Sequence, residues 1–168
     1  YAVWIYNETM RRSIADFKYR SRKENAIFYA NEVIRLYGDE IIALDPDAIV
    51  PVPIHRSKYI ERGYNQAEIL AKLIGKELNM PVLPGLLLRN KKTLPQKQLS
   101  DKERLKNLSE AFCYNAKAAS KHNKPIKRVL LVDDIYTTGS TIEACTNVLK
   151  SNGVLEVFFT VLCIGEGF

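Results

Sequence analysis

Residues 129–141 read VLLVDDIYTTGST, and this stretch decides the fold of the chain. Its first four residues form an apolar run whose length and composition predict a buried strand. We expect that strand to end at two adjacent carboxylates, Asp133 and Asp134. A loop of hydroxyl side chains around Gly139 follows, and residues 142–149 carry apolar side chains at the spacing of an amphipathic helix. The stretch therefore predicts a strand, an acidic pair, a hydroxyl-rich loop and a helix, in that order.

This order of elements suits a sugar-phosphate ligand. Backbone N–H groups and the positive end of the helix dipole favour a phosphate, Gly139 lets the backbone come close to it, and the hydroxyls add donors. The two carboxylates can accept hydrogen bonds from vicinal hydroxyl groups or hold a divalent cation. Taken singly, a solvated turn explains the acidic pair and an ordinary N-cap explains the hydroxyls. Their combination favours a ligand site, although the sequence has neither the Gly-Lys-Ser/Thr of a P-loop nor a G-x-G-x-x-G motif.

The composition predicts one soluble globular domain. The chain has 168 residues, of which 46% are hydrophobic and 26% charged, as is ordinary for a domain with a single core. No apolar run is long enough to cross a bilayer, and the start does not resemble a signal peptide. Three widely spaced cysteines (Cys113, Cys145 and Cys163) form neither a disulfide framework nor a zinc pattern. We therefore expect a cytoplasmic protein without membrane insertion.

Basic charge is concentrated in three segments. Residues 11–23, 89–108 and 117–128 each carry a net charge of +5, while the whole chain carries +6, so the remainder carries −9. The segments are either solvated surfaces or contacts for a polyanion such as a pyrophosphate group or a nucleic acid. The sequence leaves these two interpretations about equal, because neighbours in sequence need not cluster in space.

The order of apolar and polar segments predicts an α/β fold, a mostly parallel sheet with helices on both faces. Strands are expected at residues 1–6, 47–54, 111–114, 126–133 and 154–164, with a turn and short strand within 81–88. Helices are expected at residues 8–19, 23–37, 64–79, 101–110 and 140–152, with Gly38 as the stop of the second. Ligands of such sheets bind at the carboxyl ends of strands. The acidic pair and the segment after Ile54 should therefore lie at the same edge.

A second candidate site is VPVPIHRSKYIERGYNQAE, residues 50–68. The guanidinium groups of Arg56 and Arg62 suit bidentate contacts with phosphate oxygens. His55 is a weak candidate for metal binding or acid–base work, and an ordinary surface histidine is the alternative. Asn65 is a candidate cap for the helix that follows. A third segment, residues 89–112, is basic and contains a proline, which predicts a mobile loop.

The 129–141 stretch resembles the PRPP-binding signature of type I phosphoribosyltransferases. The resemblance implies that Asp133 and Asp134 contact the ribose hydroxyls of PRPP and act with Mg²⁺, which they hold directly or indirectly. It further implies a loop for the 5-phosphate, made of Thr137, Thr138, Gly139, Ser140 and Thr141. A pyrophosphate loop is implied at Val52, Pro53, Ile54, His55 and Arg56. With the acidic pair, Arg56 is the implied catalytic group, and the loop that closes over the site contributes Arg89, Lys91, Lys92, Gln96 and Arg104.

The motifs as a set resemble the ComF family of competence-associated phosphoribosyltransferase-like proteins. They comprise Pro51, Pro53, Arg62, Gly63, Asn65, Gln66, Arg89, Thr93, Gln96, Leu99, Arg104, Asn107, Ala111 and Phe112. Gln98 is an alternative to Gln96, and the T-x-x-Q and Q-x-x-L spacings favour Gln96. ComF proteins usually begin with a four-cysteine zinc ribbon, which this sequence does not contain, so zinc is not expected. The resemblance implies a single domain made of a hood-like region, residues 1–45, and a core, residues 46–168.

The resemblance implies Mg²⁺-dependent phosphoribosyl transfer from PRPP to an unknown acceptor, in a protein that acts in natural competence and DNA uptake. The expected partners are PRPP, single-stranded DNA and proteins of the competence machinery, and the expected state is a monomer or homodimer. Two alternatives use the same fold without catalysis. One is a scaffold that binds single-stranded DNA, and the other is a regulator that senses PRPP.

Overall fold

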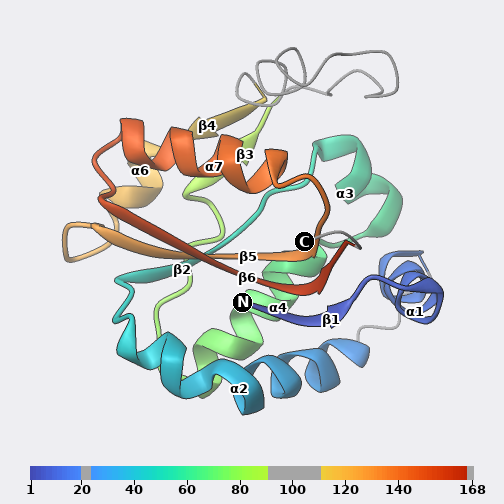
Figure 1. Ribbon diagram of the computed structural model, residues 1–168. Helices are drawn as coiled ribbons and strands as arrows, with labels where there is room; N and C mark the ends of the chain where they lie inside the picture. The colour runs from blue at the N-terminus through green and yellow to red at the C-terminus, as the bar shows by residue number, and fades with distance from the viewer. Residues whose placement is uncertain (20–23, 91–110, 166–168) are drawn as a thin grey trace.

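The protein is built around a parallel sheet, described by a computed structural model for residues 1–19, 24–90 and 111–165 (Figure 1). The strand order is β1-β6-β5-β2, and each neighbouring pair is parallel. The strands are β1 (Ala2–Ile5), β2 (Ala48–Pro51), β5 (Arg128–Tyr136) and β6 (Glu156–Ile164). The two long strands β5 and β6 lie in the middle, so the 129–141 stretch begins in the centre of the fold.

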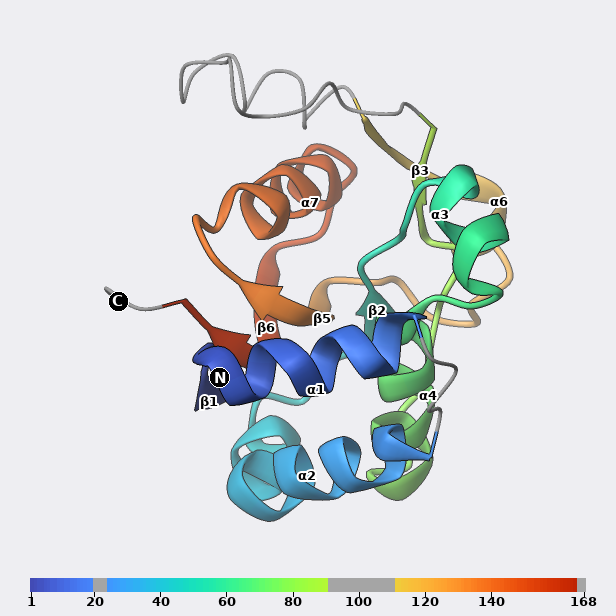
Figure 2. The same ribbon diagram turned by 90° about the vertical axis from the view of Figure 1, so that its right-hand side faces the viewer.

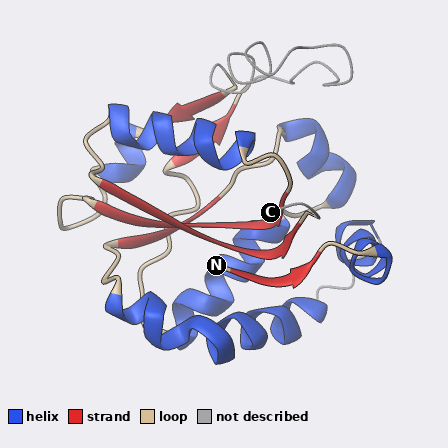
Figure 3. Ribbon diagram, viewed as in Figure 1, coloured by secondary structure: helices blue, strands red, loops and turns tan. Residues whose placement is uncertain are grey.

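Helices cover both faces of this sheet, as the sequence predicts (Figure 3). Helices α2 (Asn25–Ala43) and α4 (Gln66–Glu77) pack on one face, and α7 (Ser140–Ser151) packs on the other. A two-stranded antiparallel sheet of β3 (Leu87–Arg89) and β4 (Phe112–Tyr114) lies with α7, followed by the short helix α6 (Ala116–Ala119). Helices α1 (Glu8–Tyr19) and α3 (Arg56–Arg62) lie at the edge where the strands end, and Figure 2 looks onto this edge.

The alternation of side chains along β5 divides the interior into two cores. Leu130 and Val132 contribute to the core under α1, α2 and α4, whereas Val129 and Leu131 contribute to the core under α7 and β3. All four side chains are at most 1% exposed. Because neighbouring residues of a strand point to opposite faces, a strand buried on both sides is apolar throughout. The continuous apolar run at 129–132 thus has its explanation in the layered fold.

Two predicted boundaries are wrong. The helix expected to stop at Gly38 continues to Ala43, because Ile41 in its last turns is fully buried. Burying an isoleucine stabilises by about 1.5–3 kcal/mol, which outweighs the roughly 1 kcal/mol cost of a helical glycine. The strand expected to end at the acidic pair continues through it to Tyr136, because β6 pairs with β5 as far as Ile164. The acidic pair is therefore held in the sheet.

Other differences are smaller. Helix α3 follows β2 in a stretch where the sequence analysis expects no helix. The strand expected at 47–54 ends at Pro51, since prolines interrupt the ladder. The helix expected at 101–110 lies outside the described residues. The described part of the first 45 residues packs with the rest of the domain, since β1 pairs with β6 and α2 shares a core with α4 and β5. The division at residue 45 stays a prediction. In the described part of the chain, no helix has the length and apolar character needed to span a bilayer.

Candidate functional site

The acidic pair on β5 is flanked by a cation on each face of the sheet. Successive strand residues point to opposite faces, so Asp133 faces α7 and Asp134 faces α1. The Lys18 ammonium lies 2.7 Å from an Asp134 carboxylate oxygen. On the other face, Asp133 interacts electrostatically with Arg89 of β3 and with Cys145 of α7. The Arg89 guanidinium lies over the Phe112 ring, 5.2 Å from its centre.

Burial and the neighbouring charge of Asp134 raise the pKa of Asp133 to about 7. The backbone N–H of Asp134, which donates to an Asp133 carboxylate oxygen at 2.8 Å, and the charges of Lys18 and Arg89 act in the opposite direction. Burial also lowers the pKa of the Arg89 guanidinium, and the charge of Asp133 opposes this shift. Because the pKa of Asp133 lies near neutral pH, a change in the surroundings of this carboxyl group changes its charge.

The loop after β5 is shaped for an anion. Gly139 has φ = +76°, and among the described residues no side chain caps the start of α7 that follows it. The Thr138 and Ser140 hydroxyl oxygens lie 2.9 Å apart. Residues 135–142 surround a hollow of about 20 Å³. Backbone N–H groups in the first turn of a helix, without a side-chain cap, bind phosphate readily.

The segment after β2 lies at the same edge of the sheet. The Val52 N–H donates to the Val132 carbonyl at 2.9 Å, and the Val52 carbonyl accepts from the Asn65 side chain at 3.0 Å. His55 caps α3, because its Nδ1 atom accepts from the Ser57 N–H at 3.1 Å. Arg56 and Arg89 line a common hollow of about 260 Å³ beside Pro53 and Ile54. Two guanidinium groups thus converge next to the expected pyrophosphate loop.

The structure brings most of the predicted site together. Residues 52–56, the acidic pair and residues 137–141 all lie at the carboxyl ends of β2 and β5, together with Arg89. Lys91, Lys92, Gln96 and Arg104 lie outside the described residues. The sequence analysis missed Lys18, which it counted only within a basic segment. A signal was present, because Lys18 follows the buried Phe17 and lies one turn after the buried Ile14.

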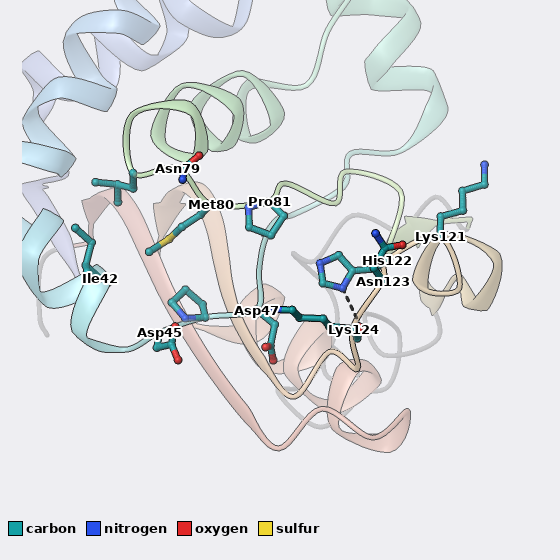
Figure 4. Close-up of a pocket in the computed structure, with 12 residues that line it drawn as sticks. Ile42, Asp45, Asp47, Asn79, Met80, Pro81, Lys121, His122, Asn123 and Lys124 are labelled. Carbon is teal, nitrogen blue, oxygen red and sulfur yellow. Dashed lines mark hydrogen bonds between the residues drawn. The ribbon is translucent and has the colours of Figure 1, made fainter.

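A second hollow lies at the opposite end of the sheet (Figure 4). Its volume is about 640 Å³, and it is lined by the ends of α2 and α4 and by residues 121–124 before β5. Asp47, Met80 and His122 are among its lining residues, and none of the predicted site residues is. The His122 Nδ1 atom lies 2.9 Å from the Lys124 carbonyl, so it donates there. Because ligands of parallel sheets bind at the carboxyl ends, this hollow is not the candidate site.

The acidic pair fits a magnesium ion that a substrate also coordinates. Among the described residues, no three or more His, Cys, Asp or Glu side chains converge as a metal site. Mg²⁺ prefers oxygen ligands and is usually held by one or two carboxylates together with substrate phosphates and water. The carboxylates of Asp133 and Asp134 would supply that protein share, and a phosphorylated substrate would supply the rest.

Comparison with known proteins identifies related sequences. The phosphoribosyl transferase domain family model matches residues 62–166, which include the acidic pair and the hydroxyl loop. Competence protein F of Haemophilus influenzae is 42% identical over 112 residues, 67% of this chain and 48% of that protein. Competence protein ComFC of Bacillus subtilis is 28% identical over 156 residues, 90% of this chain and 58% of that protein. These two relatives confirm the predicted resemblance to the ComF family.

DNA utilization protein YhgH of Escherichia coli is 31% identical over 118 residues, 70% of this chain and 49% of that protein. The chain thus spans about half the length of the curated relatives it matches. Among solved structures, a purine phosphoribosyltransferase from Pyrococcus horikoshii aligns at 18% identity with a TM-score of 0.44, covering 97% of this chain and 77% of its own.

Proposed function

Because the chain belongs to the phosphoribosyl transferase domain family, we propose that it binds PRPP with Mg²⁺ at the carboxyl ends of β2 and β5 and transfers the phosphoribosyl group to an acceptor. The observation that carries this proposal is the convergence of an acidic pair, an uncapped helix start and two arginines at one edge of a parallel sheet. Each of these groups matches a different part of PRPP.

The ribose and its 5-phosphate are bound by β5 and the loop that follows. Asp133 and Asp134 accept hydrogen bonds from the two ring hydroxyls of the ribose. The position of these two residues in the sheet holds their carboxylates in place. Residues 137–141 surround the 5-phosphate with hydroxyl and backbone N–H donors at the start of α7. Gly139 permits the left-handed turn that aims these N–H groups at the phosphate.

The pyrophosphate is held by the segment after β2. Arg56 and Arg89 line the hollow beside this segment and stabilise negative charge as the bond from ribose C1 to pyrophosphate breaks. The acidic pair and PRPP would together hold Mg²⁺, and the metal would supply further positive charge to the leaving group. A nitrogen atom of the acceptor then bonds to C1 of the ribose, and positioning of the two reactants provides much of the rate.

The relatives suggest where this activity is used. Two of them are called competence proteins and a third a DNA utilization protein. We propose that this chain acts in natural competence and DNA uptake, in the cytoplasm, with single-stranded DNA and proteins of the competence machinery as partners. The three cysteines are free thiols, which suits a reducing compartment.

A second candidate function is a scaffold that binds single-stranded DNA without catalysis. The observation in its favour is the basic segment at residues 117–128, in which Lys121 and Lys124 are exposed. Several phosphate contacts give an affinity that falls steeply with salt. Reversing both charges, Lys121→Glu with Lys124→Glu, should flatten that salt dependence and leave PRPP binding unchanged. A regulator that senses PRPP would bind it without turnover.

Calorimetric titration with PRPP, with and without Mg²⁺, tests the main proposal. Wild type should bind in a Mg²⁺-dependent manner, and Asp133→Asn with Asp134→Asn should abolish binding, because amides neither balance the metal's charge nor accept both hydroxyls. Asp39→Asn, an exposed change on α2, is the matched control and should bind like wild type. Unchanged binding by the folded double variant would remove the acidic pair from the site. A wild type that does not bind PRPP would favour the scaffold.

A further inference from the structure

We infer that Lys18 is a positioning residue of the PRPP site: through Asp134, it supplies positive charge to the acidic pair until the metal and PRPP arrive. This inference rests on the proposed function, because it assigns a role within the same site. It brings α1 into a site otherwise built from β3, from β5 and from the segments that follow β2 and β5.

The contact between Lys18 and Asp134 is sheltered from solvent. The ammonium and carboxylate lie 2.7 Å apart, and their side chains are 18% and 13% exposed. The ion pairs Lys58–Glu61 and Lys72–Glu68, by contrast, involve side chains that are 29% to 59% exposed. A pair near the surface contributes little, whereas removing one partner of a buried pair leaves an uncompensated charge. Lys18 therefore matters more to the acidic pair than an ordinary surface lysine would.

The segment Arg62–Gln66 holds α1 in the position that this contact requires. The Tyr64 hydroxyl donates to the Phe17 carbonyl, next to Lys18 in the chain. The Arg62 guanidinium donates to the Tyr19 hydroxyl at 3.0 Å and lies 4.9 Å from the centre of the Tyr19 ring. These contacts fix the last turn of α1 on both sides of Lys18.

The same segment also holds the expected pyrophosphate loop. Asn65 donates its side-chain N–H to the Val52 carbonyl at 3.0 Å and caps α4 through the Ala67 N–H at 3.2 Å. Gln66, which is 1% exposed, accepts from Arg62 at 3.1 Å. The R-G-Y-N-Q motif therefore has a structural explanation, because it ties the helix that carries Lys18 to the loop that faces pyrophosphate.

The charges explain why the site needs this lysine. PRPP carries a phosphate and a pyrophosphate, and two uncompensated carboxylates would repel it. Lys18 on one face and Arg89 on the other balance the acidic pair without a metal. Because Mg²⁺ can supply the same charge once bound, the effect of Lys18 on PRPP affinity should be largest when Mg²⁺ is scarce. A purely structural role of Lys18 would affect binding equally at all Mg²⁺ concentrations.

PRPP affinity measured by calorimetry at limiting and at saturating Mg²⁺ tests the inference. Lys18→Met should bind PRPP about tenfold more weakly than wild type at limiting Mg²⁺, and the deficit should largely disappear at saturation. Lys18→Arg keeps the charge and should restore binding. Lys72→Met removes the exposed cation of an ion pair on α4 and should match wild type under both conditions. If circular dichroism shows that Lys18→Met does not fold, Lys18→Gln serves as the uncharged variant instead. Its side-chain amide can still donate a hydrogen bond to Asp134.

The outcomes of this experiment distinguish a failure of the inference about Lys18 from a failure of the proposed function on which it rests. Equal affinities for wild type and the uncharged variant at limiting Mg²⁺ would overturn the role of Lys18, and so would a deficit of the same size at both Mg²⁺ concentrations. In either case the wild type still binds PRPP, and the proposed function stands. Absence of PRPP binding by the wild type would instead overturn the proposed function, and the role of Lys18 with it.

Discussion

At the carboxyl ends of the strands, Asp134 forms an ion pair with a side chain of a helix that is distant in sequence. At the amino ends, Asp47 instead accepts hydrogen bonds from the backbone at the start of the neighbouring strand. The Asp134 partner is Lys18, 116 residues away. Asp47 accepts from the N–H groups of Lys127 and Arg128 at 2.7 and 2.8 Å. A side-chain partner can move away when a ligand arrives, but backbone donors of the sheet cannot. The first arrangement suits binding, and the second suits stability.

The hollows at the two ends of the sheet support the same distinction between an end suited to binding and an end suited to stability. The amino end has the hollow of about 640 Å³, while the hollows at the carboxyl end are about 260 and 20 Å³. Volume alone would select the wrong end. The chemistry of the lining groups distinguishes them, because the convergent cations and the acidic pair lie at the carboxyl end.

The largest expected effect tests the phosphate loop at the carboxyl end. Gly139→Ala should weaken PRPP binding by about 100-fold, because a left-handed alanine costs up to about 3 kcal/mol and its methyl group meets the Tyr136 ring. Gly153→Ala is the matched control at the amino end, where φ is +93° and no atom lies within 4 Å of the added methyl group. That control should lose stability and bind PRPP normally. Normal PRPP binding by Gly139→Ala would show that the loop does not hold the phosphate.

The next effect should appear in stability alone. Asp47→Ala should lower the free energy of unfolding by about 1–3 kcal/mol, because the backbone N–H groups of Lys127 and Arg128 lose their acceptor, while PRPP affinity stays unchanged. Chemical denaturation and calorimetry measure the two quantities. Asp45→Asn is the matched control, because it removes a charge from the lining of the same hollow and keeps a residue type that tolerates the φ of +47° at this position. A fall in PRPP affinity for Asp47→Ala would mean that the two ends of the sheet are coupled.

The remaining effect concerns pH. A carboxyl whose pKa is about 7 in the folded protein and about 4 in the unfolded chain keeps its proton longer when folded. The free energy of unfolding should therefore fall as pH rises from about 4 to 7. Asp133→Asn lacks this titration, so it should become more stable relative to wild type over that range. Denaturant unfolding at several pH values, with Asp39→Asn as control, checks this; parallel pH curves for wild type and Asp133→Asn would contradict it.

The sequence predicts the framework of this protein because the framework depends on local patterns. The apolar runs of β2, β5 and β6 and the periodicity of α4 are visible in the chain, and so is the order that brings 52–56 and 133–141 to one edge. The continuation of α2 past Gly38 depends on the packing of Ile41, and the extension of β5 depends on its pairing with β6. Lys18 was missed for the same kind of reason, because its partner is remote in sequence.

The pairing of β1 with β6 has a consequence for synthesis on the ribosome. Ala2 lies opposite Val161 and Trp4 opposite Cys163, so the first strand must wait for one of the last segments to be translated. Until residues 156–164 emerge, the apolar edge that β1 will cover lacks its partner, and α1 has no complete sheet on which to dock. Contacts between such distant segments close slowly and leave apolar surface exposed. The nascent chain should therefore depend on chaperones until translation of β6 is complete.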